Sequence, residues 1–270
     1  MADPTRADVD ILYRASVAVQ RVFREVRSSP HRADVVGMGA TGSPTEEIDR
    51  IAEAEIQRVL DAEGVDWDLL SEEIGAVRRG GGRTLVVDPI DGTHNALRGL
   101  PFATVSLALG RRDLGGVELG LVRDLYRGTT YWAVRGEGAF RDGRPIRTRP
   151  WDARKEVVFA NLGHRATPRV NAFARRAHRV RSLGCASLEI LSVAEGAGDA
   201  YLFENGPAGA NLRATDIAAA ACILEEAGGV VTDADGESLR AFPLALDRRT
   251  SVFARGDPAF ARAGAPEGAP

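Results

Sequence analysis

The chain contains very little cysteine and almost no lysine. Only two of its 270 residues are cysteines, Cys185 and Cys222, and both stand among small apolar residues. This scarcity excludes a disulfide framework, so each cysteine is expected to be a small buried side chain in a protein of the reducing cytoplasm. Lys155 is the only lysine among 35 basic residues, a bias that indicates genomic base composition rather than function.

Long apolar runs and blocks of like charge are also missing. Nowhere do 18 apolar residues follow one another, and Met1 to Asp10 carry charges of both signs without an apolar core. These features predict neither a membrane span nor a secretion signal. The formal net charge of -3 supplies no basic field, so nucleic acid and membranes are not expected partners.

The most informative segment that is present places two carboxylates three residues apart on a bend. It follows the apolar run 85–87 and consists of Asp88, Pro89, Ile90, Asp91, Gly92 and Thr93. The proline has no N–H, so it should end the strand and turn the Ile90 carbonyl out of pairing, while Gly92 lets the backbone approach a ligand. Because no histidine or cysteine ligand stands in this set of hard oxygen donors, the segment favours Mg2+ over Zn2+.

Three further acidic positions lie where strands end or helices begin. Glu72 and Glu73 follow the strand-like residues 67–70, Asp216 precedes the helical run 217–224, and Asp49 follows residues 44–48. Each position has an ordinary alternative, because acidic pairs are mostly solvated surface and an aspartate commonly caps a helix. Their order along the chain is the informative property.

Together these motifs resemble the inositol monophosphatase family, and specifically its archaeal and bacterial branch, over about residues 8 to 256. The family signatures are an acidic pair, then Asp-Pro-Ile-Asp-Gly-Thr-x-Asn, then an Asp before Ala-Ala, and all three occur here. The resemblance implies a layered αβαβα sandwich of the sugar-phosphatase type with the site between its halves. It also implies a homodimeric phosphomonoesterase that depends on two or three Mg2+ ions, for which Mn2+ could substitute.

The same resemblance assigns roles to residues of this chain. Metal ligands would be Glu72, Asp88, the Ile90 carbonyl, Asp91 and Asp216. Catalytic residues would be Asp49, Glu72 and Thr93, with the Asp49 carboxylate orienting the Thr93 hydroxyl for activation of a water. Substrate-binding residues would be Asp91, Gly92, Thr93, Gly184, Cys185, Ala186, Glu204 and Arg213. For the last group a plain helix start at Cys185 and a solvated Arg213 stay open as alternatives.

Departures from the family pattern affect the pocket rather than the ligands. Thr215 stands where the family has a tryptophan, Ala96 replaces an aromatic residue, and Thr41 stands where related archaeal-type members often carry an aspartate. We therefore expect a small phosphorylated polyol or sugar as substrate, inositol monophosphate or fructose 1,6-bisphosphate. The alternatives are a phosphatase of 3'-phosphoadenosine phosphates or dinucleotide phosphates, which would need a shelf for a base, and a non-catalytic member.

Two other phosphate-related patterns are set aside. An aspartyl-nucleophile phosphatase places its two aspartates two residues apart, whereas Asp88 and Asp91 are three apart. The glycine-rich segment 37–42 follows no predicted strand and has no lysine after it, so it is predicted to be a mobile loop and not a phosphate cradle.

Apolar periodicity divides the chain into an α+β half, residues 1–150, and an α/β half, residues 151–270. In the first half, helices over 8–29 and 44–63 should pack on one side of a sheet, the second beginning at Pro44 and Thr45. Strands are predicted over 85–87, 104–109, 117–123 and 128–134, followed by a hairpin that turns at Asp142 and Gly143. The second half should alternate strands and helices, with strands at 157–161, 180–183, 200–203, 230–232 and 251–254.

Overall fold

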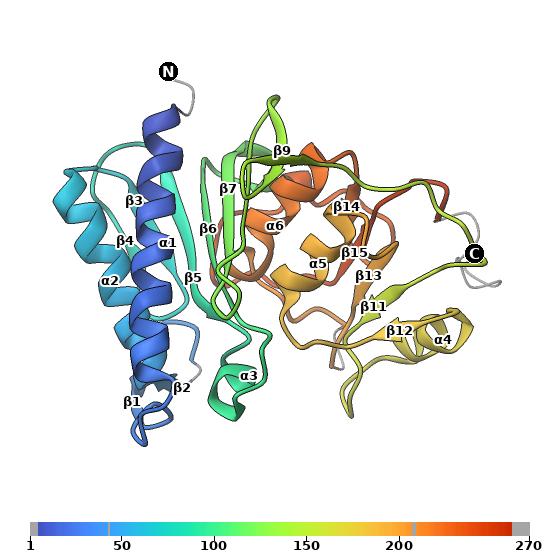
Figure 1. The fold of residues 1–270 in the computed structure, drawn as a ribbon, viewed down its shortest axis with the longest axis horizontal. Coiled ribbons are helices and arrows are strands. Elements are labelled where there is room, and N and C mark those ends of the chain that lie inside the picture. The colour runs from blue at the N-terminus through green and yellow to red at the C-terminus, as the bar shows by residue number, and fades with distance from the viewer. Residues whose placement is uncertain (1–4, 43, 207–208, 261–270) are drawn as a thin grey trace.

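The structure of the chain is a computed structural model that describes residues 5–42, 44–206 and 209–260 (Figure 1). The first half contains α1 (Arg6–Val26), β1 (Val35–Met38), β2 (Pro44–Glu46), α2 (Glu47–Glu63), β3 (Asp68–Ser71), β4 (Gly75–Val77), β5 (Thr84–Asp91), α3 (Thr93–Arg98), β6 (Thr104–Gly110), η1 (Leu114–Gly116), β7 (Val117–Asp124), β8 (Thr130–Val134), β9 (Gly138–Arg141) and β10 (Arg144–Ile146). The second half contains β11 (Val158–Ala160), α4 (Pro168–Arg176), β12 (Val180–Arg181), α5 (Ala186–Ala194), β13 (Ala200–Phe203), α6 (Ala214–Glu226), β14 (Val230–Thr232), η2 (Leu239–Ala241) and β15 (Val252–Arg255).

The first sheet has eight strands in the order β10-β9-β8-β7-β6-β5-β3-β4. Its neighbours are antiparallel except for β3 and β5, which run parallel and therefore end at the same edge. Helices α1 and α2 lie side by side on one face of this sheet, as predicted (Figure 1). Alternate residues of β6 show the two faces, since Leu107 and Leu109 pack toward α1 and α2 whereas Ala108 packs toward α6.

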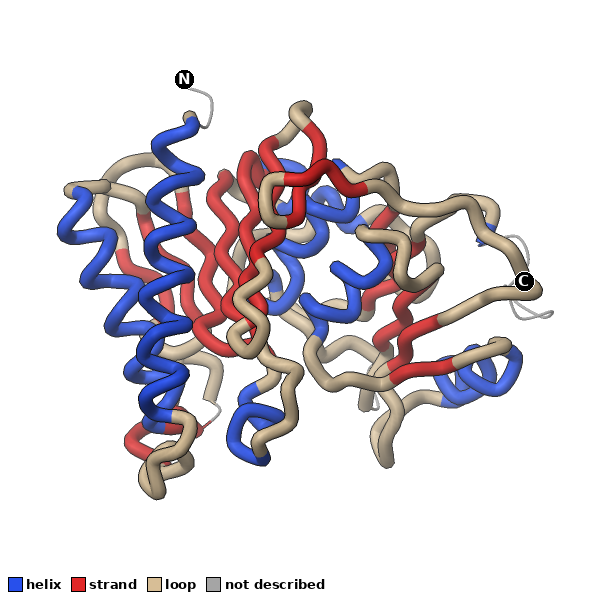
Figure 2. The backbone as a smooth tube through the Cα atoms, viewed as in Figure 1, coloured by secondary structure: helices blue, strands red, loops and turns tan. Residues whose placement is uncertain are grey.

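The middle layer of the molecule consists of α5 and α6, which lie between the two sheets (Figures 1 and 2). Helix α6 carries the alanine run 218–221, and small side chains let it approach the first sheet closely. A Cβ atom added to Gly120 of β7 would lie 2.6 Å from the Ala219 carbonyl oxygen. The close approach of α6 therefore requires a glycine on β7. Because Asp216 stands in the first turn of α6, this packing also sets its distance from the first sheet.

The second sheet has the order β12-β11-β13-β15-β14, with β11 parallel to both neighbours and β15 antiparallel to both of its own. Along β13, Tyr201 and Phe203 face the middle helices, whereas Ala200 and Leu202 belong to the clusters beneath α4. Helix α4 thus covers the outer face. The layers run helix, sheet, helix, sheet, helix, which confirms the predicted sandwich.

Three local predictions are wrong. Pro44 and Thr45 do not begin a helix, because they pair as β2 with β1, and α2 begins at Glu47. Residues 37 and 38 of the glycine-rich segment belong to β1, so the segment is not wholly a loop. Strand β5 does not end at Pro89 but continues to Asp91, since the missing N–H only makes the pairing with β6 irregular between Asp88 and Asp91.

Other expectations agree with the structure. Asp142 and Gly143 form the turn between β9 and β10, both at positive φ. Cys185 and Cys222 are free and buried. Among the described residues, no helix is both long and apolar enough to cross a membrane.

Candidate active site

The acidic positions come together where β3 and β5 end and α6 begins. One carboxylate oxygen each from Glu72, Asp88 and Asp216 lies within 4.8 Å of the others. Glu72 follows β3, Asp88 lies near the end of the neighbouring β5, and Asp216 stands in the first turn of α6. Because β3 and β5 are parallel neighbours, their ends bring Glu72 and Asp88 to one edge, and α6 supplies the third group from the middle layer.

Asp216 lies at the third position of its helix rather than at the N-cap. Helix α6 begins at Ala214, and the Asp216 carboxylate accepts a hydrogen bond from the backbone N–H of Arg213 at 2.5 Å. The same carboxylate therefore both stabilises the start of α6 and belongs to the acidic cluster. The sequence had left open which of these two roles Asp216 has.

These three groups are poorly stabilised as anions by the protein alone. Burial, with repulsion from Glu72, raises the pKa of Asp216 to about 8. Burial and the neighbouring carboxylates hold the pKa of Asp88 well above its usual range, and burial also raises the pKa of Glu72. A bound cation would reverse these shifts, because opposite charge favours the ionised form. Oxygen donors without histidine or cysteine suit a hard divalent ion, so the residues fit Mg2+.

Asp91 is not part of this close cluster. Its Oδ2 accepts hydrogen bonds from the backbone N–H of Ser187 at 2.7 Å and from the Ser187 hydroxyl at 2.5 Å. Its Oδ1 receives a long bond of 3.3 Å from the N–H of Ala186. Asp91 thus ties the end of β5 to the N-terminus of α5, where free N–H groups favour an anion. Because Oδ1 receives only this one long bond from the described residues, it can accept a further interaction.

Thr93 and Asp49 meet as the resemblance implies. The Thr93 hydroxyl lies 3.1 Å from Asp49 Oδ1 and 2.8 Å from the Ile90 carbonyl oxygen, two acceptors that compete for its single proton. Burial, with repulsion from Glu73 adding, raises the pKa of Asp49 to about 8. The Ile90 carbonyl thus accepts a hydrogen bond from a side chain of the bend.

Gly92 is required by its position in the bend. It adopts φ 87°, and an added Cβ atom would lie 2.5 Å from the Phe102 carbonyl oxygen. A side chain there would meet both the strain of positive φ and a backbone clash. Gly92 then caps α3, so its backbone and that of Thr93 open a short helix at the site.

Arg213 is a buried partner of the cluster and not a solvated side chain. Its Nη1 donates to Glu72 Oε1 at 3.1 Å, and its Nη2 donates to the Thr41 carbonyl at 3.4 Å. Its Nε has no hydrogen-bond partner among the residues that the structure describes. The guanidinium therefore joins Glu72 to the segment that contains Thr41.

Asn95, which closes the motif, connects it to the segment before α5. Its Nδ2 donates to the carbonyls of Phe102 at 3.0 Å, Leu183 at 2.8 Å and Gly184 at 3.1 Å. Gly184 and Cys185 thereby lie beside the bend, and a Cβ atom at Gly92 would lie 3.3 Å from that of Cys185. The predicted substrate segment and the predicted metal motif are adjacent in space.

Glu204 lies in a different environment. Its Oε2 accepts a hydrogen bond of 2.5 Å from the Thr167 hydroxyl, and its Oε1 lies 3.5 Å from the Arg169 guanidinium. Thr167 is the N-cap of α4 on the outer face of the second sheet. The contacts of Glu204 therefore serve the start of α4, and its role in substrate binding stays a prediction.

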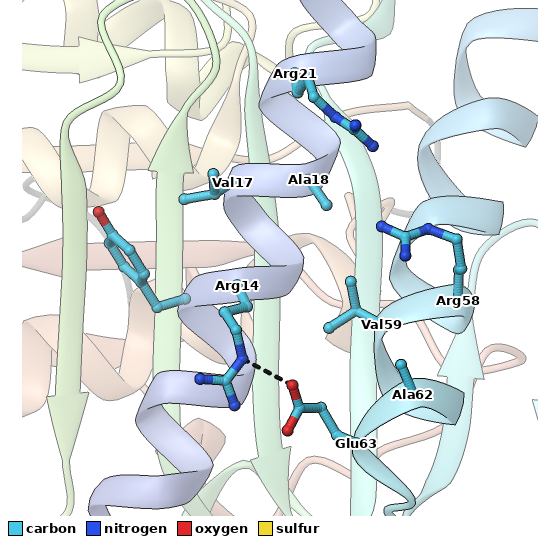
Figure 3. Close-up of a pocket in the computed structure, with 9 residues that line it drawn as sticks. Arg14, Val17, Ala18, Arg21, Arg58, Val59, Ala62 and Glu63 are labelled. Atoms are coloured by element: carbon cyan, nitrogen blue, oxygen red, sulfur yellow. Dashed lines mark hydrogen bonds and ion pairs between the residues drawn. The ribbon is translucent and has the colours of Figure 1, made fainter.

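A surface groove between α1 and α2 lies apart from the acidic cluster (Figure 3). Val17, Ala18 and Val59 are among its apolar lining residues, and the ion pair of Arg14 with Glu63 joins the two helices at 2.8 Å. Both helices cover the opposite face of the first sheet from α6. This groove therefore takes no part in the site.

Sequence reasoning missed three supporting contacts. It gave no role to Asn95 and no partner to Asp91, and it named Arg213 as a substrate-binding residue without its ion pair. Asn95 could have been found, since it stands inside the motif itself. Ser187 and Arg213 gave no local signal, because their partners lie 96 and 141 residues away.

The layered fold and the cluster of three carboxylates are typical of the class of metal-dependent sugar-phosphate phosphatases. The family model of the inositol monophosphatase family matches residues 5–263, and the chain belongs to that family. It is therefore a phosphoric monoester hydrolase.

Similar proteins come from both sequence and structure. A fructose-1,6-bisphosphatase/inositol-1-monophosphatase of Methanothermobacter thermautotrophicus is 35% identical over 268 residues, covering 92% of this chain and 94% of the relative. A bifunctional NADP phosphatase/NAD kinase of Methanococcus maripaludis is 33% identical, but the alignment covers 82% of this chain and 42% of that protein. A crystal structure of an inositol monophosphatase-fructose 1,6 bisphosphatase superposes with a TM-score of 0.81 at 26% identity, covering 94% of this chain and 96% of the other.

Proposed function

We propose that this chain is a Mg2+-dependent phosphomonoesterase that hydrolyses a small phosphorylated polyol or sugar, with inositol 1-phosphate and fructose 1,6-bisphosphate as its substrates. The observation that carries the proposal is the meeting of Glu72, Asp88 and Asp216 within 4.8 Å at one sheet edge. The relative that is 35% identical is named for both activities.

The residues would divide the work of holding the ions. We propose that Glu72, Asp88 and the Ile90 carbonyl hold one ion, and that Asp88, Asp91 and Asp216 hold a second, with a weaker third beside Glu72. Support for this division comes from the free acceptor capacity of Asp91 Oδ1 and from the raised pKa values of Asp88 and Asp216. When bound, such ions supply positive charge to the phosphate dianion and acidity to a water molecule.

The chain's own residues would position the remaining parts. The Thr93 hydroxyl, held between Asp49 and the Ile90 carbonyl, would orient the attacking water. Because this hydroxyl contacts the Asp49 carboxylate, Asp49 could accept the proton that the water loses through Thr93. Backbone N–H groups of Gly92 and Thr93, at the start of α3, would donate to the phosphate oxygens. Gly184, Cys185 and Ala186, next to the bend, would contact the alcohol part of the substrate.

A second candidate substrate is a dinucleotide phosphate. The relative from Methanococcus maripaludis is named as an NADP phosphatase, and a second such protein, from Methanocaldococcus jannaschii, is 32% identical. NADP would need an aromatic or apolar surface for its bases. The half-buried side chain of Phe102 could provide one, since the backbone carbonyl of this residue contacts Asn95 of the motif.

The experiment is a measurement of phosphate release with Mg2+ from inositol 1-phosphate, fructose 1,6-bisphosphate, NADP and 3'-phosphoadenosine 5'-phosphate. Ratios of kcat/KM decide between the candidates. We expect the sugar and polyol phosphates to exceed NADP by at least about tenfold. Higher kcat/KM on NADP would transfer the proposal to the second candidate, and no Mg2+-dependent release from any of the four would overturn it.

We further propose that the protein is a cytoplasmic homodimer. Two free buried cysteines suit a reducing compartment. Light scattering coupled to gel filtration measures the mass directly, and a monomer at micromolar concentration would contradict the assignment of a dimer.

A further inference from the structure

A second pocket, of about 480 Å3, opens between α5, the first sheet and the edge of the second sheet. Its walls come from the end of β7, from β8 and β9, from β11 and β12, and from α5 and the residue Leu183 that precedes it. Neither Glu72, Asp88 nor Asp216 lines it. Its volume falls within the range of pockets that hold small organic ligands, about 300 to 1,000 Å3.

The charged side chains of this pocket leave one positive charge in excess. Asp124 pairs with Arg127 at 2.8 Å, and Glu195 pairs with Arg141 at 2.7 Å. The third arginine, Arg181, makes a hydrogen bond to the carbonyl of Val180 and has no carboxylate partner among the described residues. Arginine carries five N–H donors in a planar fork that matches carboxylate and phosphate oxygens.

The remaining wall is mixed, since Thr129, Tyr131 and Ser192 contribute polar groups beside apolar side chains. Phe102, Phe159, Leu183 and Leu188 are among these apolar residues, so a ligand that places its anionic group at Arg181 could pack an apolar or planar body against them. Neither a bare inorganic ion nor a neutral sugar makes use of both parts. The lining therefore selects an organic anion with a phosphate or carboxylate group and a hydrophobic or aromatic body.

The pocket shares two residues with the support of the active site. The carbonyls of Phe102 and Leu183 accept hydrogen bonds from Asn95 Nδ2 at 3.0 and 2.8 Å, and Asn95 belongs to the motif that carries Asp91. A ligand packed on these two side chains would contact the residues that hold Asn95 in place. A displacement of either carbonyl would therefore reach the bend between β5 and α3.

We propose that this pocket is an effector site for a small organic anion, separate from the acidic cluster, and that its occupation changes the turnover of the enzyme. The binding part stands on the pocket alone, whereas the effect on turnover rests on the proposed phosphatase function. The two parts are tested by separate measurements, so that their failures can be distinguished.

The binding test uses 8-anilinonaphthalene-1-sulfonate, an aromatic anion that a phosphatase cannot hydrolyse. Fluorescence titrations are made on the full chain in EDTA, where the acidic cluster repels anions. We expect saturable binding of one probe per chain, displaced by 5'-AMP. Arg181→Ser, an exposed position, should weaken binding about tenfold, since hydrogen bonds to charged groups are the strong ones. Ala197→Trp, at the exposed rim, should fill the pocket and abolish binding.

The matched control is Arg58→Ser, which removes an arginine from the groove between α1 and α2 (Figure 3) and should leave binding unchanged. Absence of saturable binding, or equal loss in the Arg58 and Arg181 variants, would overturn the site. A second copy of the chain covering the pocket would produce the first of these results.

The turnover test measures phosphate release with Mg2+ as the probe concentration rises. We expect kcat to change with the same half-saturating concentration as binding, and to become insensitive to the probe in Ala197→Trp. Saturable binding with unchanged kcat and KM would overturn the effector role while leaving the site in place. If the enzyme released no phosphate from any substrate, the fluorescence result would still decide the binding part.

Discussion

Nη1 of Arg213 lies 3.1 Å from Oε1 of Glu72, so a permanent cation stands beside the carboxylates of the acidic cluster. Arg213 is buried, and its second contact is the carbonyl of Thr41. The guanidinium therefore offsets part of the negative charge of Glu72 in the metal-free protein. A divalent ion that approaches Glu72 has to share that carboxylate with it.

The first prediction concerns Mg2+ affinity. Arg213→Met should bind Mg2+ roughly tenfold more tightly, because removing a charge a few ångströms away changes binding by about 1 to 4 kcal/mol. Its kcat should fall, since Glu72 and the Thr41 segment lose their common partner. Calorimetric titration with Mg2+ measures the affinity, and Arg213→Lys, which keeps the charge, is the control. Weaker Mg2+ binding by the Met variant would show that Arg213 acts by positioning Glu72.

The second prediction concerns Asp88, whose pKa burial and its neighbours hold well above the usual range. Asp88→Asn should lower kcat at least about a thousandfold because it removes a ligand shared by both proposed ion positions. In EDTA the variant should melt at a higher temperature than the parent, since it lacks a buried carboxyl group whose ionisation burial, Asp91 and Glu72 oppose. Asp10→Asn, on the exposed side of α1, is the control for both assays. Retained turnover in a folded Asn variant would remove Asp88 from the mechanism.

The third prediction is a pH dependence from a group outside the cluster. Burial raises the pKa of Glu189 from 4.5 to about 8, and its Oε1 accepts a hydrogen bond of 2.8 Å from the Leu183 N–H. Between these pH values the folded state binds a proton that the unfolded state has lost. The stability from this group is complete below about pH 4.5 and is lost as the pH rises through about 8.

Urea unfolding at saturating Mg2+, from pH 5 to pH 9, checks this dependence. Glu189→Gln keeps the acceptor for Leu183 and cannot titrate, so the fall in the free energy of unfolding should be shallower than in the parent. Saturating Mg2+ keeps the cluster carboxylates ionised, so they no longer contribute to the pH dependence of the free energy of unfolding. An equal slope in both proteins would show that Glu189 is already ionised at neutral pH.

The fourth prediction tests the link made by Asn95. Asn95→Ala leaves the carbonyls of Phe102, Leu183 and Gly184 without this donor, which should cost about 2 kcal/mol of stability and raise KM. Asn171→Ala is the matched control, because its Nδ2 also donates to two backbone carbonyls but lies on exposed α4. Thermal unfolding and substrate saturation curves provide the readouts. Similar small losses in both variants would make Asn95 an ordinary surface amide.

The fifth prediction separates two roles of glycine at the bend. Gly92→Ala combines positive φ with a contact of 2.5 Å to the Phe102 carbonyl oxygen. The variant should therefore lose about 2 kcal/mol or more of its free energy of unfolding, together with most of its activity. Gly99→Ala has φ 74° but open space around its Cβ, and should cost only about 1 kcal/mol. Urea unfolding of the two variants gives the comparison. Equal losses would mean that the close approach of Phe102 exerts no effect.

Much of the site could be predicted from the sequence. Asp88, Asp91 and Thr93 stand next to one another along the chain, so their bend follows from local chemistry. Glu72 and Asp216 could be placed because they adjoin a strand and a helix whose apolar patterns are plain. The layers could be predicted as well. Helices α1 and α2 have one apolar face, as expected of an outer layer, whereas the alanine run of α6 is apolar on all sides, as expected of a helix between two sheets.

The sequence by itself determined which acidic groups the cluster contains, because the types and order of the acidic residues are local properties. Only the tertiary structure decided which groups stabilise those acids. The contacts of Arg213 with Glu72 and of Ser187 with Asp91 join residues 141 and 96 positions apart. Such pairs depend on where β3, β5, α5 and α6 meet, and that geometry arises from the packing of whole layers rather than from any neighbouring residue.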